Sequence, residues 1–223
     1  MKKKREQILV AGVLAGSVWG FSEVVLGAFV KSAALPLRGT MMTAIGVGIL
    51  FALFALRRSI VAVAIAVLTT VVIKATCAIY LGGLDSIINS SLAVMLEGSF
   101  IVIFCGIYLW SRGAPTPDSE PLRARHSAAL AAIGIFCAGT LFYIIGNHLA
   151  PCPYLKSLSA SQFLLHETIP WSLFSAATAP LGYFVGLKLK ENSAEERIIT
   201  APALVTTACC WIACAITVYI SGA

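Results

Sequence analysis

Long apolar stretches separated by short polar segments repeat along the whole chain. A bilayer-spanning helix needs about 20 predominantly apolar residues, and seven stretches approach or exceed that length. We expect helices at residues 8–30, 40–56, 60–82, 90–111, 127–148, 168–187 and 200–221. The pattern predicts an all-α integral membrane protein, in which a bundle of about seven transmembrane helices occupies residues 1–223 as a single domain.

The basic residues predict how this bundle is oriented. With the N-terminus in the cytoplasm, twelve of the 16 Lys and Arg residues lie in cytoplasmic segments, three lie in external segments, and Lys74 lies within a helix. Cytoplasmic loops of membrane proteins carry an excess of Lys and Arg. We therefore expect a multi-pass protein of the cell (inner) membrane, with the N-terminus cytoplasmic and the C-terminus external.

Composition supports a membrane location and argues against a nucleic-acid partner. Hydrophobic residues make up 59% of the chain, charged residues only 12%, and the mean hydropathy is +0.91. A soluble domain carries about 25% charged residues. The formal net charge of +6 arises from basic residues between apolar segments, without a patch of interleaved basic and aromatic residues. The lipid bilayer is thus the expected partner, and nucleic acid is not.

Three ionisable residues lie inside predicted helices, where charges are costly and face a partner or a cavity. They are Glu23, Lys74 and Glu97. With a rise of about 1.5 Å per residue, each lies roughly 20 Å from the inner and 10 Å from the outer surface. We therefore expect the three side chains to share one layer, nearer the external side.

Residue spacing predicts which way these groups point. Glycines 12, 16, 20 and 27 and Glu23 follow helical spacings, so they are expected on one face where another helix approaches closely. Glu23 would then point into the bundle. Similar polar stripes are Thr70, Lys74 and Cys77; Thr140, Tyr143 and Asn147; and Ser175, Thr178 and Gly182.

The layer has three possible interpretations. The charges could form an internal ion-pair network that only fixes helix packing. The second carboxylate, which Lys74 cannot also neutralise, could bind a cation or a ligand with a donor group. Alternatively, one carboxyl group is protonated. The sequence leaves these alternatives open.

The external connection at residues 149–167 is long for a compact bundle, which is typical of a segment that covers or builds a site. Its apolar residues suit a short interfacial helix or a re-entrant turn. It brings Asn147, His148, His166 and Glu167 to the outer mouth as further candidate ligand-binding residues. The two histidines and Glu167, together with Cys152, are legitimate metal ligands, but the spacing matches no metal-site signature. Tyr154 and Trp171 suit the interfacial aromatic belt.

Signatures of catalysis or of a cofactor are missing. The chain contains no HExxH, GxSxG or Walker motif, and no CxxC. No cofactor can be named from these residues. Catalysis by His148, His166 and the carboxylates stays an alternative.

The outline resembles the substrate-binding S components of energy-coupling factor (ECF) transporters, in the pattern Ala11-x3-Ala15, in Ala62-x3-Ala66 and in Pro36-Leu-Arg-Gly-Thr40. That resemblance implies a small hydrophobic bundle, usually of six helices. It would bind a ligand near its external face and dock a transmembrane coupling subunit with an ATPase module.

The leading hypothesis is a membrane transport protein that binds a small molecule or ion in an outward-facing polar pocket for uptake. It could act as the substrate-binding subunit of a larger transporter. The alternatives are a membrane-embedded enzyme with an external site for a lipid or exported substrate, and a structural or assembly subunit whose buried charges only specify packing.

Overall fold

Helices account for nearly all of the structure. The computed structural model describes residues 2–33, 37–81, 84–111, 124–149, 153–192 and 200–222, and no strand occurs among them. The long helices are α1 (Lys2–Phe21), α3 (Arg38–Arg57), α4 (Ile60–Leu81), α5 (Leu84–Ser111), α6 (Ala124–Leu149), α9 (Ile169–Asn192) and α10 (Thr200–Gly222). The short ones are α2 (Gly27–Ser32), α7 (Pro153–Ser157), α8 (Ala160–Phe163) and two π-helical turns, η1 (Ser22–Leu26) and η2 (Leu164–Thr168).

The prediction of an all-α membrane bundle is confirmed at the level of its helices. Within the described residues, six helical segments are long and apolar enough to cross a membrane: Arg5–Val30, Arg38–Arg57, Ile60–Cys77, Asn89–Ser111, Arg125–His148 and Pro202–Ile220. The sixth expected helix, at 168–187, forms as α9 but is not among the six segments. Polar Ser172, Ser175 and Thr178, together with two lysines near its end, lower its hydropathy.

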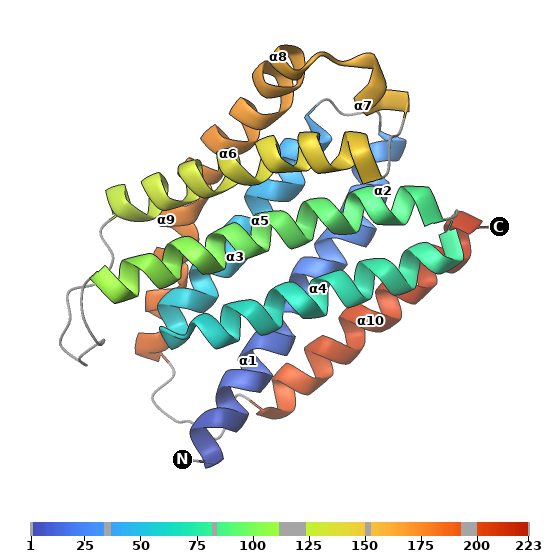
Figure 1. The fold of residues 1–223 in the computed structure, drawn as a ribbon. Coiled ribbons are helices and arrows are strands. Elements are labelled where there is room, and N and C mark those ends of the chain that lie inside the picture. The colour runs from blue at the N-terminus through green and yellow to red at the C-terminus, as the bar shows by residue number, and fades with distance from the viewer. Residues whose placement is uncertain are drawn as a thin grey trace.

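The long helices pack side by side as an elongated bundle (Figure 1). Helix α9 packs against α3 and α6, α4 lies between α1 and α5, and α10 packs at the edge along α1 and α4. The first turn of α1 and the last turn of α10 lie at opposite ends of the bundle. An odd number of long helices produces this arrangement.

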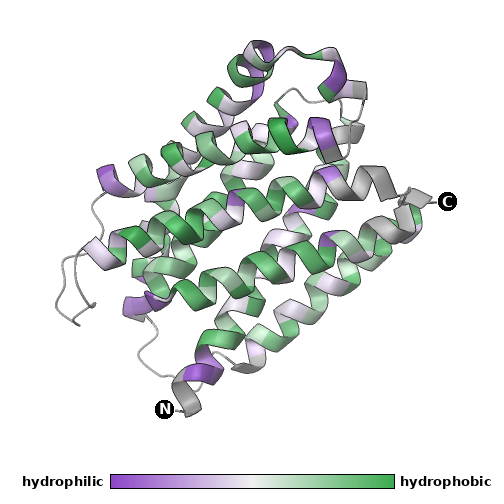
Figure 2. Ribbon diagram, viewed as in Figure 1, coloured by the Kyte–Doolittle hydropathy of each residue, from purple (hydrophilic) through white to green (hydrophobic). Residues whose placement is uncertain are grey.

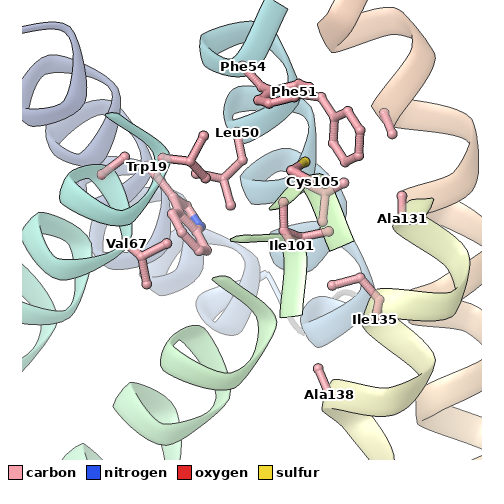
Figure 3. Packing of buried hydrophobic residues seen from close by; sticks show 14 of the residues in the cluster. Trp19, Leu50, Phe51, Phe54, Val67, Ile101, Cys105, Ala131, Ile135 and Ala138 are labelled. Atoms are coloured by element: carbon pink, nitrogen blue, oxygen red, sulfur yellow. The ribbon is translucent and has the colours of Figure 1, made fainter. Parts of the chain in front are cut away.

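Apolar side chains fill the centre of the bundle and also cover much of its outside. Trp19, Phe51 and Phe54 are almost completely buried, and Figure 3 shows them among side chains from neighbouring helices. On the outside, Leu68 and Leu204 are each more than half exposed. Hydrophobic residues run along the lengths of the long helices in Figure 2. A surface of this kind suits lipid contact better than water.

The predicted glycine stripe divides into two parts. Gly12 and Gly16 lie directly against the α4 backbone. A Cβ on Gly12 would be 2.8 Å from the carbonyl oxygen of Ala62, and a Cβ on Gly16 would overlap the carbonyl oxygen of Ala66. Beyond η1, Gly27 instead lies near Arg38 and Met42 of α3. The expectation of one continuous face is wrong, because the π-helical turn changes the direction of the residues that follow it.

The connection at residues 149–167 is more helical than expected where the structure describes it. Short helices α7 and α8 form in this segment, for which the sequence offered one short interfacial helix or a re-entrant turn. The sixth predicted helix was expected from residue 168, but helical structure runs continuously from Ala160 to Asn192. A capping box between Ser159 and Gln162 begins it, since each side chain binds the other residue's backbone N–H.

Candidate functional site

An ion pair joins the first and third long helices inside the bundle. Lys74 Nζ of α4 lies 2.7 Å from Glu23 Oε2 of η1, and both side chains are largely buried. Glu23 lies in a π-helical turn, a distortion that is common at functional sites. The pair therefore links α4 to the irregular part of α1.

The second oxygen of Glu23 is held by its own helix. Trp19 Nε1 donates a hydrogen bond of 3.3 Å to Glu23 Oε1. The indole of Trp19 occupies the space that a side chain at Gly46 of α3 would need. Both oxygens of Glu23 are thus engaged, one by the ammonium group of Lys74 and one by an indole packed against α3.

Glu97 of α5 is the less compensated carboxyl group. Its side chain is only 5% exposed, and Thr43 Oγ1 of α3 donates a hydrogen bond of 2.8 Å to its Oε1. Among the described residues, no basic side chain forms an ion pair with it, because Lys74 pairs with Glu23. Glu97 nevertheless lies close enough to interact electrostatically with both Glu23 and Lys74.

The structure therefore brings together the three residues expected to share a layer. They come from η1, α4 and α5, and Thr43 adds α3 to the group. We name Glu23, Lys74, Glu97 and Thr43 the buried polar layer. Its chemistry is that of a satisfied ion pair beside a buried carboxyl group with one hydroxyl donor, an arrangement able to accept a cation or an N–H donor at Glu97.

The expected polar stripes serve mainly helix packing. Across the α1–α4 contact, Thr70 Oγ1 donates a hydrogen bond of 2.9 Å to the Gly16 carbonyl oxygen. Across the α3–α9 contact, Thr178 Oγ1 donates a hydrogen bond of 2.9 Å to the Ala44 carbonyl oxygen. Thr140 bonds within its own helix. The hydroxyl groups of Thr70 and Thr178 thus join neighbouring helices.

The outer candidates form a separate region. His148 and His166 are exposed, and Asn147 donates a hydrogen bond to the Tyr143 carbonyl oxygen of its own helix. Glu167 accepts a hydrogen bond from the Tyr154 hydroxyl of α7. None of these contacts reaches the buried polar layer, so the predicted set of ligand-binding residues divides into an inner and an outer group.

No metal centre is evident in the described part of the chain. Within it, no group of three His, Cys, Asp or Glu side chains could hold a metal ion. Cys152, one of the ligands considered from the sequence, lies outside the described residues. A site that needs His148, His166 and Glu167 alone has no support in this geometry.

Trp171 corrects one expectation. It was assigned to the interfacial belt, but it is only 7% exposed and packs against Phe142 and Phe163, with ring centroids 6.3 Å and 5.8 Å away. Glycine at position 39 leaves room for its indole, since a Cβ there would be 3.0 Å from Trp171 Nε1. Tyr154 is exposed, as expected.

Some residues of this region carry no sequence motif. Thr43 and Trp19, which hold the two carboxylates, escaped sequence analysis because isolated Thr and Trp residues are common in membrane helices. Helical spacing offered one signal, since Trp19 and Glu23 are four residues apart and therefore neighbours on one face.

The small-residue patterns behind the ECF resemblance lie within the chain's own packing. Ala62 and Ala66 are fully buried, and Ala11 is nearly so. Ala15 is partly buried against the same core. These alanines hold α1 against α4 and leave little of themselves for a second protein. Pro36, which belongs to the third pattern, lies outside the described residues.

Comparison with known proteins adds no relative. No family model, no curated protein and no solved structure matches the chain. The buried polar layer in a helical bundle, with six helices suited to crossing a membrane, is the basis for assigning a function.

Proposed function

We infer that the chain is a multi-pass membrane protein that binds a small molecule or ion at the buried polar layer for uptake. Its proposed setting is the cell (inner) membrane, with seven crossings and the N-terminus in the cytoplasm. Two features support a seventh crossing by α9. Its 24 residues span about 36 Å at 1.5 Å per residue, enough for a bilayer core. Its outward side chains, including Leu173, Leu181 and Phe184, are exposed and apolar.

One observation carries the ligand-binding proposal. Glu97 is buried, accepts one hydroxyl hydrogen bond, and lies beside a lysine already paired with Glu23. A packing network alone would need only the matched pair, because each further buried carboxyl group adds a cost that no partner offsets. A third ionisable group of this kind inside a membrane protein favours an ion or ligand pathway.

The test is binding and uptake with a matched pair of variants. The full chain is purified in lipid nanodiscs, and its thermal stability is measured with Na⁺, K⁺, choline, primary amines and amino acids. We expect at least one compound to stabilise the protein, and Glu97→Gln to abolish that effect. Glu167→Gln is the control, because it removes a carboxylate of the outer group.

The same compound is then offered to proteoliposomes. Uptake by the chain alone supports a self-sufficient carrier. Binding without uptake supports a substrate-binding subunit, which would need a coupling subunit and an ATPase module from other proteins. If no compound binds and Glu97→Gln only raises the thermal stability, the charges serve packing and the transport proposal is wrong.

A further inference from the structure

Three buried hydrogen-bond donors at one end of the α3–α9 contact have no partner. They are Thr40 Oγ1, Trp171 Nε1 and Ser175 Oγ, and none of them has a hydrogen-bond partner among the described residues. Thr40 and Ser175 are 0% exposed. Buried polar groups in native proteins are nearly always satisfied by protein or by an ordered molecule, so this group calls for an explanation.

Helix α3 relates the unpartnered indole to Glu97. Trp171 Nε1 lies against Gly39, and Glu97 accepts a hydrogen bond from Thr43. Gly39 and Thr43 are four residues apart on α3, so they share a face and are separated by about one helical turn of 5.4 Å. The indole donor and the buried carboxyl group therefore contact the same face of α3, about one turn apart.

The two hydroxyl groups belong to the same region. Thr40 precedes Thr43 by three residues on α3, and Ser175 follows Trp171 by four residues on α9. Helices α3 and α9 are in parallel register, because Gly39 meets Trp171 and Ala44 accepts a hydrogen bond from Thr178. All three donors thus lie at the start of this contact, beside the buried polar layer.

The chemistry of these groups restricts what they can bind. An indole N–H only donates, so whatever meets it must be an acceptor, which excludes a bare metal cation at that position. A carboxylate such as Glu97 accepts, so whatever meets it must be a cation or a donor. A ligand that satisfies both ends needs an acceptor group and a donor group a short distance apart.

We propose that Glu97 and the donors Thr40, Trp171 and Ser175 form a binding site for a small zwitterion of the amino-acid class. Its ammonium group binds Glu97, and its carboxylate accepts hydrogen bonds from the indole and the two hydroxyl groups. An amino acid carries its ammonium group and its carboxylate on neighbouring carbon atoms, so one short ligand supplies both the donor and the acceptor that the site requires. The inference rests on the proposed function, since it names the ligand class of the same layer.

The structure also indicates where the site opens. The π-helical turn η2 ends three residues before Trp171, and such turns are irregular points in a helix that occur often at functional sites. The segment before it is packed down by Leu155 and Phe163, both almost fully buried. Lifting this segment at η2 would expose Trp171 to the end of the bundle that carries α7 and α8 (Figure 1).

The experiment compares amino acids with the primary amines that lack the carboxylate. Glycine is paired with methylamine, alanine with ethylamine and leucine with isoamylamine, and thermal stabilisation of the full chain in nanodiscs gives each affinity. We expect one amino acid to bind at least tenfold more tightly than its amine. Trp171→Phe should weaken the amino acid at least tenfold and leave the amine unchanged. Glu97→Gln should weaken both.

Two further sets of variants keep the test decisive. Trp211 of α10 donates an indole hydrogen bond to Ser17 of α1, and Trp211→Phe, which removes it, should leave both affinities unchanged. Thr40→Val and Ser175→Ala replace Trp171→Phe if that variant fails to fold, and each should weaken the amino acid selectively. Equal binding of amine and amino acid, with Glu97 required, would overturn the zwitterion site and keep the proposed function. Binding of neither amine nor amino acid would overturn the zwitterion site, and it would overturn the proposed function as well if Na⁺, K⁺ and choline also fail to stabilise the protein.

Discussion

Two helix contacts in this bundle are built alike but treat their polar groups differently. In the α1–α4 contact, Gly16 lies against the Ala66 backbone and Thr70 donates its hydroxyl to the Gly16 carbonyl oxygen. In the α3–α9 contact, Gly182 lies against the Gly48 backbone and Thr178 donates to Ala44. The difference appears toward one end of each contact.

The α1–α4 contact ends in a matched ion pair between Lys74 and Glu23. The α3–α9 contact begins with Thr40, Trp171 and Ser175, whose donor atoms have no partner among the described residues. Close glycine packing with every polar group satisfied is what a purely structural contact requires. This difference supports a structural role for the first contact and the proposed binding role for the beginning of the second.

The largest expected effect comes from breaking the ion pair. Lys74→Met leaves Glu23 as an unpaired buried carboxylate, and breaking such a pair typically costs about 3–5 kcal/mol. The double variant Lys74→Met with Glu23→Gln should recover most of that loss, because no buried charge is left unmatched at the pair. SDS titration of the purified protein measures the free energy of unfolding. A single variant as stable as the double one would contradict the structural role of the pair.

Glycine packing gives the next effect and has a control in the same contact. A Cβ on Gly182 would overlap the Gly48 backbone, whereas one on Gly48 would meet Thr178 at an ordinary 3.8 Å. We expect Gly182→Ala to cost about 1–3 kcal/mol through overpacking and helix separation. Gly48→Ala should be nearly neutral or slightly stabilising. Similar thermal midpoints for the two variants would show that α3 and α9 are not in close backbone contact.

The smallest effect separates the two contacts most directly. Thr70→Val removes a satisfied hydroxyl from the α1–α4 contact and should cost about 1 kcal/mol. Ser175→Ala removes an unpartnered hydroxyl from the α3–α9 contact and should cost nothing without ligand, or stabilise the protein slightly. Both are measured by SDS titration in ligand-free buffer. A loss at Ser175 equal to that at Thr70 would mean that its hydroxyl already has a permanent partner.

The sequence allowed the helices and the polar layer to be predicted, because both depend on averages along the chain. Hydropathy over some 20 residues locates a helix even when its ends shift, as with α5, which begins at Leu84 before the expected residue 90. The depth of each residue along its helix was enough to place Glu23, Lys74 and Glu97 in one layer. A shift of a helix end by one turn changes that depth by only about 5.4 Å.

Contacts between side chains of different helices were beyond the sequence. Trp171 was expected at the membrane surface, because tryptophan is enriched there, but the missing side chain at Gly39 lets it pack inside. Likewise, nothing local marks Thr43 as the donor to Glu97, 54 residues away along the chain. Both contacts depend on the register between helices, which the hydropathy pattern does not encode.

In the π-helical turn η1 (Ser22–Leu26), the number of residues matters as much as their identity. A π-helical turn holds one more residue than the α-helical turn it replaces, which is equivalent to inserting a single codon. Each residue of an α-helix advances the direction of the next by about 100°. Deleting any one codon of this turn would keep the reading frame but rotate Gly27 away from Arg38 and Met42. An in-frame deletion there would therefore do more harm than most substitutions of the same residues.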